Sequence, residues 1–313
     1  MKRILFTLLI GVALLASSCG EKPAAKDKSK FQIYLCIGQS NMEGCADAVE
    51  RDYEPFRRLK MLPSMDNVER GRKLGEWCDA STPISGATAG LSPSESFGKA
   101  MVISQPEDIS IGLISVAIGG CDIRLFDRDL YEGYTATHNA EWFLKKIENY
   151  GGNPYARLIE LAKKAQEDGV ISGIILHQGE QNEGDTLWTS YVKTVYENIL
   201  SDLGLSASDV PLIAGEVVPS EIGGRAGSMN AIINTLPSVI PTAKVVSGKG
   251  CGAKADSIHY NTQGVKELGR RYARAMLEAK GIEAVPIALH SKKRSGGETP
   301  KQPVLDIKEE HKK

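Results

Sequence analysis

The run from Ile111 to Ile118, IGLISVAI, constrains the fold more than any other stretch of the chain. It is apolar almost throughout and ends at Gly119-Gly120, as expected of a strand that is buried on both faces. Strands of this kind belong to parallel sheets with helices on both sides. Four more short apolar runs that can form such strands begin at Phe31, Gly173, Pro211 and Ala243.

Helical patterns alternate with these strands. Residues 155–167 carry apolar side chains on one face and charges on the other, the pattern of a helix that covers a sheet. Further helices are expected over 94–104 (capped by Ser94), 186–203, 229–236 and 262–279. The alternation predicts one α/β domain with a five-stranded parallel sheet, right-handed crossovers and helices on both faces. The stretch 45–93, with prolines and glycines but weak periodicity, is expected to form a wall of a substrate cleft.

The chain begins like an exported bacterial protein. Lys2 and Arg3 precede an apolar run from Ile4 to Leu15, which is shorter than the ~20 residues that span a bilayer, and small residues then lead to Cys19. Small residues before a cysteine resemble the lipobox of bacterial lipoproteins, in which the cysteine becomes the acylated first residue. We therefore expect residues 1–19 to be a lipoprotein-type signal peptide with Cys19 as the lipidation site, and plain secretion is the alternative.

Polar stretches flank the expected domain. Residues 20–30 are lysine-rich and without periodicity, so they are expected to be a flexible tether, and the domain is expected over 31–283. Residues 284–313 are too polar to pack and are expected to be a disordered tail. This arrangement predicts an exported protein that contacts a bacterial membrane only through a lipid anchor, facing the periplasm or lying on the cell surface.

Composition limits the classes of partner. The 313 residues are 42% hydrophobic and 25% charged with a formal net charge of -1, which suits a globular domain with a large core and gives no electrostatic case for nucleic-acid binding. The six cysteines include no CxxC pair and show no zinc spacing. If Cys19 is lipidated, the odd number that remains cannot all pair within one chain, so the pairing stays open for Cys36, Cys45, Cys78, Cys121 and Cys251.

Three polar clusters follow apolar strands or lie in the loop beyond one. They are Gln39-Ser40-Asn41, His177-Gln178-Gly179-Glu180 and Asp256-Ser257-Ile258-His259. Because the carboxyl ends of parallel strands meet at one edge of a sheet, the three clusters are expected to lie at the same edge. Each cluster has a structural alternative, since a Ser-Asn pair favours helix N-caps and an Asp three residues before a His fits a surface turn.

Acyl transfer is the chemistry that these clusters can assemble. Ser40 is the candidate nucleophile, and it needs a base. His259 would take the proton of Ser40 and later give it to the leaving alcohol, while Asp256 fixes the tautomer of the imidazole. The chain contains no GxSxG, which argues against the nucleophile elbow of the α/β-hydrolases.

The negative oxygen that forms during acyl transfer needs donors already aimed at it. The candidates are the backbone N–H of Ser40, a backbone N–H at Gly119 or Gly120, and the side-chain amide of Gln178. Two adjacent glycines are explained equally well by a bare turn.

Four blocks, in their order and spacing, resemble the signature blocks of the SGNH (GDSL-like) hydrolases. They are Gly38-Gln39-Ser40-Asn41-Met42, Ala117-Ile118-Gly119-Gly120, His177-Gln178-Gly179-Glu180 and Asp256-Ser257-Ile258-His259. The likeness covers about residues 31–280 and is to the sialate O-acetylesterase-like branch, which includes the family 6 acetylxylan esterases. It implies a three-layer α/β/α, flavodoxin-like fold without metal or other cofactor. It also implies the roles already given to the serine, the histidine and the aspartate, with the glycine of the second block and Gln178 completing the oxyanion hole.

Neighbouring residues of the blocks are expected to support the site. Gln39 and Asn41 flank the serine, and Glu180 is expected to brace the loops through hydrogen bonds. Cys121-Asp122 and Gln181 depart from the residues usual in the family, and these departures bear on substrate preference rather than on the class of reaction.

The sequence therefore indicates a serine esterase that removes O-acetyl groups from carbohydrate. Its expected partner is an acetylated oligo- or polysaccharide, with acetylxylan or a related plant polysaccharide ahead of 9-O-acetyl sialic acid. The tryptophans Trp77, Trp142 and Trp188 can stack on sugar rings or lie in the core.

Two other functions remain open from the sequence. A metal-dependent phosphoesterase could use His177, Glu180, Glu183 and Asp185 as ligands, although no second His-rich cluster completes such a site. A non-catalytic surface lipoprotein could bind glycan in the same cleft, but the complete Ser, His and Asp set argues against it.

Overall fold

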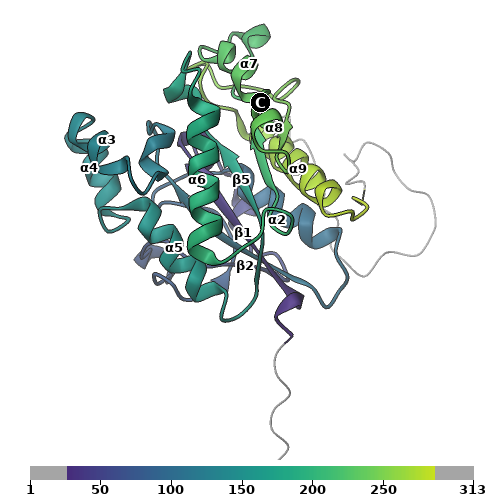
Figure 1. Cartoon of the computed structure of the whole chain (residues 1–313). Helices are drawn as coiled ribbons and strands as arrows, with labels where there is room; N and C mark the ends of the chain where they lie inside the picture. Colours follow the sequence, from purple (N-terminus) through teal and green to yellow (C-terminus); the bar gives the residue numbers. More distant parts are fainter. Residues whose placement is uncertain (1–26, 286–313) are drawn as a thin grey trace, which may run out of the picture.

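The structure, a computed structural model, describes residues 27–285, in which strands alternate with helices (Figure 1). The strands are β1 (Phe31–Gly38), β2 (Leu59–Met61), β3 (Cys78–Asp79), β4 (Ser110–Ala117), β5 (Val170–His177), β6 (Leu212–Gly215) and β7 (Lys244–Val246). The α-helices are α1 (Ser40–Glu43), α2 (Pro93–Ile103), α3 (Tyr131–Thr137), α4 (Glu141–Glu148), α5 (Pro154–Ala165), α6 (Trp188–Leu203), α7 (Asn230–Ile233), α8 (Leu236–Val239) and α9 (Thr262–Ala279). The 3-10 helices are η1 (Lys28–Lys30), η2 (Glu50–Tyr53), η3 (Val68–Arg70), η4 (Ile123–Phe126), η5 (Glu180–Asn182), η6 (Ser220–Ile222) and η7 (Gly227–Met229).

Several expectations concern the two ends of the chain. The expected signal peptide over 1–19, the lipidation site Cys19 and most of the expected tail over 284–313 lie outside the described residues. The first residues of that tail are ordered, because the backbone N–H of Val285 donates to Ser104 Oγ at 3.2 Å. No helix in the described range 27–285 is long and apolar enough to cross a membrane.

The folded part begins earlier than expected. The last residues of the expected tether over 20–30 form η1, in which the Asp27 side chain caps the helix by accepting from Ser29 N–H. Lys28 Nζ donates to the backbone oxygen of Gln166 at 2.7 Å. Residues 28–30 of the expected tether therefore form a short helix that contacts the domain.

The strands form one seven-stranded sheet in the order β3-β2-β4-β1-β5-β6-β7. All neighbouring strands are parallel except β3, which runs antiparallel to β2. The five expected strands are β1, β4, β5, β6 and β7, so the expected parallel sheet is present with β1 at its centre. The expected strand count of five is wrong, because β2 and β3 extend one edge.

The two additional strands come from the stretch 45–93, which was expected to be a wall of the cleft. β2 has three residues and β3 has two, and each is too short for an alternating pattern to appear in the sequence. Their pairing is set by the neighbouring strand, since Leu59 and Met61 lie beside Ile111 and Leu113 of β4. This stretch therefore adds two short strands to one edge of the sheet.

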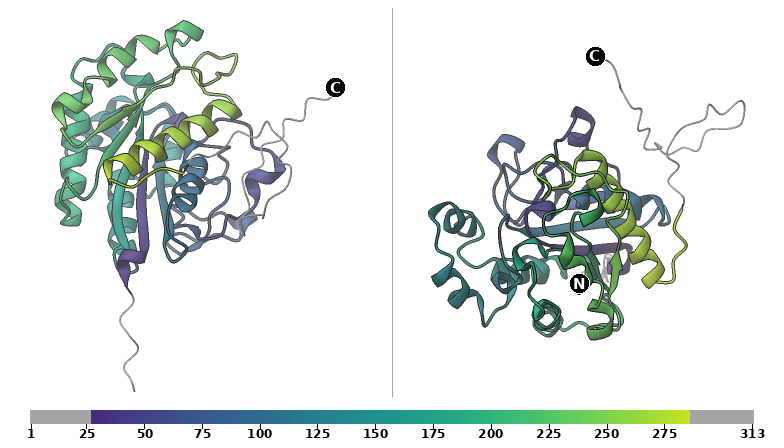
Figure 2. Two further views of the ribbon diagram at one scale, coloured as in Figure 1. Left: turned by 90° about the vertical axis from the view of Figure 1, so that its right-hand side faces the viewer. Right: turned by 90° about the horizontal axis from the view of Figure 1, so that it is seen from above.

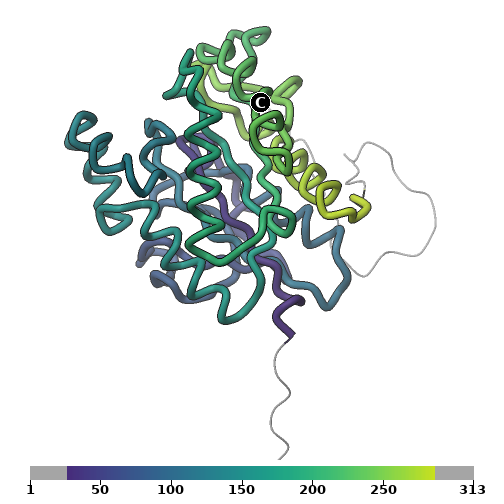
Figure 3. The backbone as a smooth tube through the Cα atoms, viewed as in Figure 1, coloured from purple at the N-terminus to yellow at the C-terminus, as the bar shows by residue number. Residues whose placement is uncertain are grey.

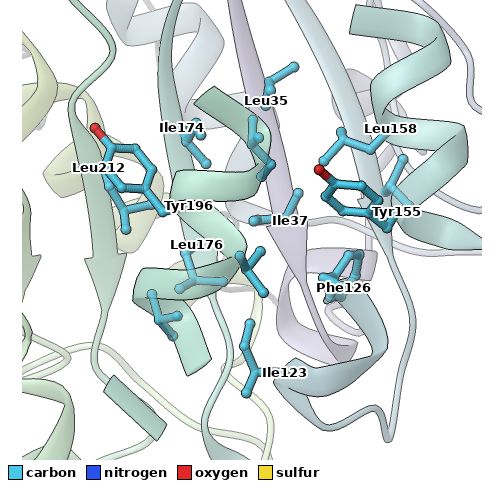
Figure 4. Close-up of a cluster of buried hydrophobic side chains, with 14 of the residues drawn as sticks. Leu35, Ile37, Ile123, Phe126, Tyr155, Leu158, Ile174, Leu176, Tyr196 and Leu212 are labelled. Carbon is cyan, nitrogen blue, oxygen red and sulfur yellow. The ribbon is translucent and has the colours of Figure 1, made fainter. Parts of the chain in front are cut away.

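The side chains of the central strands alternate between two buried cores. In β1, Leu35 and Ile37 lie in the core covered by α5 and α6, in one cluster with residues of β5, β6 and η4 (Figure 4). Tyr34 and Cys36 point to the opposite face and lie in the core covered by α2 and α9. Because both faces of the sheet are covered by helices, the fold has three layers, α/β/α, as predicted (Figures 2 and 3).

Helices α2 and α9 pack against each other on one face of the sheet (Figure 2). α9 has the predicted bounds, and its cap is Asn261, whose side chain accepts from Gly264 N–H. α2 begins one residue earlier than expected, because Ser92 rather than Ser94 is the cap and forms a capping box with Glu95. A Cβ at Gly269 would lie 2.3 Å from the Pro93 carbonyl oxygen, so glycine is what allows the two helices to approach.

Helices α3 and α4 lie between β4 and α5 in the chain and were not predicted. They lie together at one side of the molecule, at the left in Figure 1. In α4, Phe143 and Ile147 are buried whereas Trp142 is 59% exposed. Neither helix has a side-chain N-cap and both are short, so the sequence carries few of the usual start signals.

Candidate active site

The site begins where β1 ends beside β5. A Cβ at Gly38 would lie 2.1 Å from the His177 carbonyl oxygen, and its φ of +152° is also one that glycine adopts readily. Gln39 N–H donates to that same carbonyl at 3.0 Å. Ser40 follows as the first residue of α1, at the carboxyl edge of the sheet where sequence analysis placed it.

Ser40, His259 and Asp256 form a line of hydrogen bonds. Nε2 of His259 lies 2.9 Å from Ser40 Oγ, and Nδ1 lies 2.8 Å from Asp256 Oδ2. A carboxylate oxygen can only accept, so Nδ1 carries a hydrogen, and in the neutral form of the imidazole Nε2 accepts from the Ser40 hydroxyl. This is the order of groups that activates a serine for nucleophilic attack.

Asp256 is held by the loop that carries His259. Its Oδ1 accepts from the backbone N–H groups of Ile258 and His259, both at 2.9 Å. Ser257, which lies between Asp256 and Ile258, has a left-handed φ of 62°. This turn of the chain lets the carboxylate reach both its own loop and the imidazole.

The environment of this pair shifts both pKa values. Burial alone would raise the pKa of Asp256, but the two backbone N–H groups and the His259 side chain outweigh it and lower the pKa to about 2. The neighbouring Cys45 side chain raises the pKa of His259, burial lowers it and Asp256 raises it again, so that it reaches about 9. Asp256 is thus a stable carboxylate, and the imidazolium form of His259 is favoured.

Asn41 joins the three sequence clusters. Its Oδ1 accepts from Tyr260 N–H at 3.0 Å, and its Nδ2 donates to Glu180 Oε1 at 2.6 Å and to the Ile258 carbonyl at 3.2 Å. Burial raises the pKa of Glu180, but His177 and Asn41 outweigh it, so the carboxylate form is favoured. Glu180 therefore braces the loops as expected.

Of the four candidate metal ligands, His177 and Glu180 lie close together, with 3.6 Å between Nε2 and Oε1, but Glu183 and Asp185 do not complete a site with them. His177 is fully buried and its Nδ1 lies 3.0 Å from Tyr272 Oη, which itself donates to a backbone carbonyl. Glu183 accepts from Ser228, and Asp185 accepts from Asn182 and from a backbone N–H. Within the described residues, no group of three or more His, Cys, Asp or Glu side chains is placed to hold a metal ion.

Gln178 does not have the position expected of an oxyanion donor. It is 1% exposed and does not line the cavity at Ser40. Its Nε2 donates toward Gln39 Oε1 at 3.1 Å, the Cys121 carbonyl at 3.2 Å and Asn182 Oδ1 at 2.7 Å. An amide nitrogen has two hydrogens, so these three acceptors leave none for a substrate.

Gly119 is also occupied. Its backbone N–H donates to Glu43 Oε2 at 2.8 Å, and Lys146 Nζ lies 2.8 Å and 3.0 Å from the two oxygens of the same carboxylate. By contrast, the backbone N–H groups of Ser40 and Gly120 find no acceptor among residues 27–285. Of the expected backbone donors, Ser40 and Gly120 are thus available to a ligand.

A cavity of about 410 Å³ opens at Ser40 and His259. From the stretch 45–93, only Cys45 lines it, so the expected cleft wall is wrong. The wall comes instead from α4, which supplies Trp142 and Lys146, and from the loops that carry Gln181, Glu183, Arg225 and Ala226. A larger cavity of about 700 Å³ lies at the opposite edge of the sheet and contains none of these residues.

The tryptophans divide between the cavity and the core. Trp142 lines the cavity, where its ring lies over Gly120. Trp188 is fully buried and donates to Gln178 Oε1, and Trp77 is partly buried and donates to Asp168.

The cysteines whose pairing was open are all free thiols: Cys36, Cys45, Cys78, Cys121 and Cys251.

Comparison with known proteins identifies a family and a fold. The model of the family described as carbohydrate esterase, sialic acid-specific acetylesterase, matches residues 30–278. A protein of Arabidopsis thaliana named "probable carbohydrate esterase" is 24% identical over 263 residues, which are 79% of this chain and 90% of the relative.

Solved structures share the fold at low sequence identity. The crystal structure of the Arabidopsis protein superposes with a TM-score of 0.60 at 20% identity, over 79% of this chain and 98% of the other. NanS gives a TM-score of 0.60 at 13% identity, over 81% and 98%. A carbohydrate acetylesterase of Xanthomonas citri gives a TM-score of 0.55 at 17% identity, over 80% of this chain and 57% of the other.

Proposed function

The chain belongs to the carbohydrate esterase family of sialic acid-specific acetylesterases, and we propose that it is a serine esterase that removes O-acetyl groups from carbohydrate. The observation that carries the proposal is the line of hydrogen bonds from Asp256 through His259 to Ser40 at the wall of an open cavity. A non-catalytic glycan-binding protein would have no need of this alignment.

The proposed reaction has two halves. In the first, His259 Nε2 takes the hydroxyl proton of Ser40 as Oγ attacks the acetyl carbonyl carbon, and the carbonyl oxygen becomes an oxyanion. The oxyanion collapses, the bond to the sugar oxygen breaks, and His259 gives its proton to that oxygen. In the second half, water attacks the carbonyl carbon of acetyl-Ser40 while His259 takes its proton, and the bond to Ser40 Oγ then breaks to release acetate as His259 returns the proton to Oγ.

We propose acetylxylan or a related plant polysaccharide as the substrate. The exposed indole of Trp142 beside Gly120 supports this choice, because a flat aromatic face on the cavity wall suits an uncharged sugar ring.

A second candidate, 9-O-acetyl sialic acid, is favoured by Arg225. This residue is exposed on the cavity wall, and its guanidinium makes no hydrogen bond or ion pair within the described part of the chain. A free guanidinium suits the carboxylate of an acidic sugar.

Acetate release on the two substrates side by side tests the function. Release from either substrate by the wild-type protein and loss in Ser40→Ala is the expected result. Carbohydrate binding without acetate release from any acetylated substrate would establish the non-catalytic alternative.

We also propose that the protein is exported and anchored to a bacterial membrane through Cys19. The support is the charged, apolar and small-residue pattern of residues 1–19. The wild-type protein should fractionate with membranes and incorporate labelled fatty acid, and Cys19→Ser should do neither. Membrane association that is unchanged in Cys19→Ser would refute the anchor.

A further inference from the structure

Helix α4 reaches the cavity with one side of its surface. Trp142 and Lys146 are four positions apart, so they lie on the same face of the helix, and both line the cavity. Phe143 and Ile147, on the neighbouring face, are buried in the core. Apolar packing therefore holds the inner side of α4, while its cavity side presents an aromatic ring and an ammonium group.

Lys146 ties α4 to the helix that carries the nucleophile. Its Nζ lies 2.8 Å and 3.0 Å from the two carboxylate oxygens of Glu43, the last residue of α1. Ser40 is the first residue of α1, so one short helix carries both the nucleophile and the partner of Lys146. Within the described part of the chain, no other side chain of α4 makes a hydrogen bond or an ion pair. The Glu43–Lys146 pair is therefore the polar contact between α4 and the nucleophile helix.

The carboxylate of Glu43 is firmly held. Its side chain is 14% exposed, and its Oε2 also accepts from the backbone N–H of Gly119 at 2.8 Å. Hydrogen bonds to a charged group are stronger than those between neutral groups. Glu43 thus joins α1, the loop after β4 and α4 at one point, and Lys146 bonds to a partner that has little freedom to move.

This contact lies beside the reacting groups. A Cβ at Gly119 would lie 3.1 Å from Lys146 Nζ and 3.4 Å from Ser40 Cβ, so both groups border the same point. A Cβ at the next residue, Gly120, would lie 3.0 Å from the ring of Trp142. A sugar ring that stacks on Trp142 therefore meets the nucleophile in a position that α4 determines. Neighbouring acetyl esters sit on adjacent carbons of a sugar ring, so a small displacement of the ring exchanges one ester for another.

We propose that the Glu43–Lys146 pair selects which acetyl ester of a sugar ring is hydrolysed. It does so by fixing Trp142, and with it the stacked ring, relative to the nucleophile. This inference rests on the proposed esterase function and adds two positioning residues to it. A misplacement of about 1 Å can lower a rate by about 10²-fold, so loss of the pair changes the ratio of the rates at two esters.

The test uses an uncharged sugar, methyl 2,3,4-tri-O-acetyl-β-D-xylopyranoside, from which the first acetate lost is assigned to its ring position by ¹H NMR. The ratio of initial rates at two positions does not depend on the amount of folded enzyme, so a loss of stability cannot imitate the effect. We expect the wild-type protein to favour one position and Lys146→Met to change the ratio by about tenfold. Lys145→Met is the matched control, because Lys145 is exposed on the same helix and does not line the cavity, and the ratio should not change.

Further variants separate the effect of position from that of charge. Lys146→Met leaves the Glu43 carboxylate unbalanced beside a reaction that develops negative charge, so kcat on methyl acetate should fall as well. In the double variant Glu43→Gln/Lys146→Met that charge is gone, and the amide oxygen can still accept from Gly119 N–H. Its kcat on methyl acetate should return toward the wild-type value, whereas its ratio on the sugar should remain altered. If Lys146→Met does not fold, Lys146→Ala takes its place in both experiments.

A mutant cycle with Trp142 tests whether the pair acts through the ring. Trp142→Ala should alter the ratio by itself, and addition of Lys146→Met should then change the ratio no further. An equal change of the ratio with and without Trp142 would contradict the proposal.

The remaining outcomes distinguish this inference from the proposed function. A ratio that keeps its wild-type value in Lys146→Met and in the double variant overturns the role of the pair, as does a wild-type protein that removes the ring acetates at equal rates. Hydrolysis of methyl acetate without hydrolysis of the sugar ester also overturns it, because no stacked ring is then recognised. Each of these results leaves the serine esterase standing. Failure of the wild-type protein to release acetate from methyl acetate and from every acetylated sugar would overturn the proposed function itself.

Discussion

Asn41 binds the residues on both sides of His259. Its side chain donates to the Ile258 carbonyl and accepts from Tyr260 N–H, although it lies beside Ser40 and 219 positions before Tyr260 in the chain. The residue next to the candidate nucleophile thus sets the position of the loop that carries the candidate base. This contact explains how two distant segments hold Ser40 Oγ and His259 Nε2 at 2.9 Å.

Replacement of Ser40 by alanine should abolish turnover of a simple aryl acetate. Loss of a triad serine typically lowers the rate by about 10⁶. The melting temperature should remain near that of wild type, because the hydroxyl that is removed contacts mainly His259. Ser96→Ala, which alters another nearly buried serine away from the cavity, is the control for both measurements. A folded Ser40→Ala protein with a tenth of wild-type activity would refute the serine mechanism.

Activity should rise with pH, and the midpoint of the rise should lie well above the pKa of an ordinary histidine. The pKa of His259 is raised from 6.5 to about 9, and only the neutral imidazole can accept the Ser40 proton. Lowering the pH below about 9 therefore removes the base, and kcat/KM should fall. The pH profile of kcat/KM on an aryl acetate measures where this acidic limb, the pH range over which activity falls, lies.

The same profile in Cys45→Ala isolates the cause of the shift. Removal of the Cys45 side chain, the largest contribution to the raised pKa of His259, should move the limb to lower pH. The control is Cys78→Ala, because Cys78 does not line the cavity. A limb that stays in place in Cys45→Ala would contradict this electrostatic account.

The central part of the fold could be predicted because its signals are local. The apolar runs of β1, β4 and β5 and the amphipathic pattern of α9 each span enough residues to show their periodicity. β2 and β3 could not be predicted, since a strand of two or three residues is defined by its neighbour and not by its own pattern.

Part of the candidate site could likewise be predicted from the sequence, and part could not. Ser40, His259 and Asp256 could be placed at one edge because each follows a strand or lies in the loop beyond one, and the structure brings them together. The environment of Gln178 could not be predicted, because its acceptors at Gln39 and Cys121 lie 139 and 57 positions away. The contact of Glu43 with Gly119 is likewise non-local, and no residue pattern indicates it.

Replacement of Gln178 by alanine should lower both stability and rate. The indole N–H of the fully buried Trp188 would lose its acceptor, which should reduce the free energy of unfolding by about 1–3 kcal/mol. Gln39 Oε1 would lose one of its three donors, so kcat should fall by much less than the about 10²–10³-fold that loss of a direct oxyanion donor costs. Chemical denaturation and acetate-release kinetics measure the two effects. An unchanged stability with a kcat loss of about 10²–10³-fold would instead make Gln178 the direct oxyanion donor.

The choice of substrate should depend on Trp142 and Arg225 in opposite ways. Trp142 is 59% exposed, so Trp142→Ala should cost little stability, and an aromatic contact of about 0.5–1.5 kcal/mol with a sugar ring would raise KM on acetylated xylo-oligosaccharide by roughly 2- to 13-fold. KM for methyl acetate, which has no ring, should not change, and Trp142→Phe should retain much of the affinity.

If the substrate is an acetylated sialic acid, Arg225→Gln should raise KM for that sugar and leave KM for methyl acetate unaffected, because only the sialic acid carries a carboxylate for the guanidinium. Kinetics of the two variants on the three substrates therefore decide between the sugars. An unchanged KM for acetylated xylo-oligosaccharide in Trp142→Ala, together with a raised KM for sialic acid in Arg225→Gln, would reject xylan in favour of the acidic sugar.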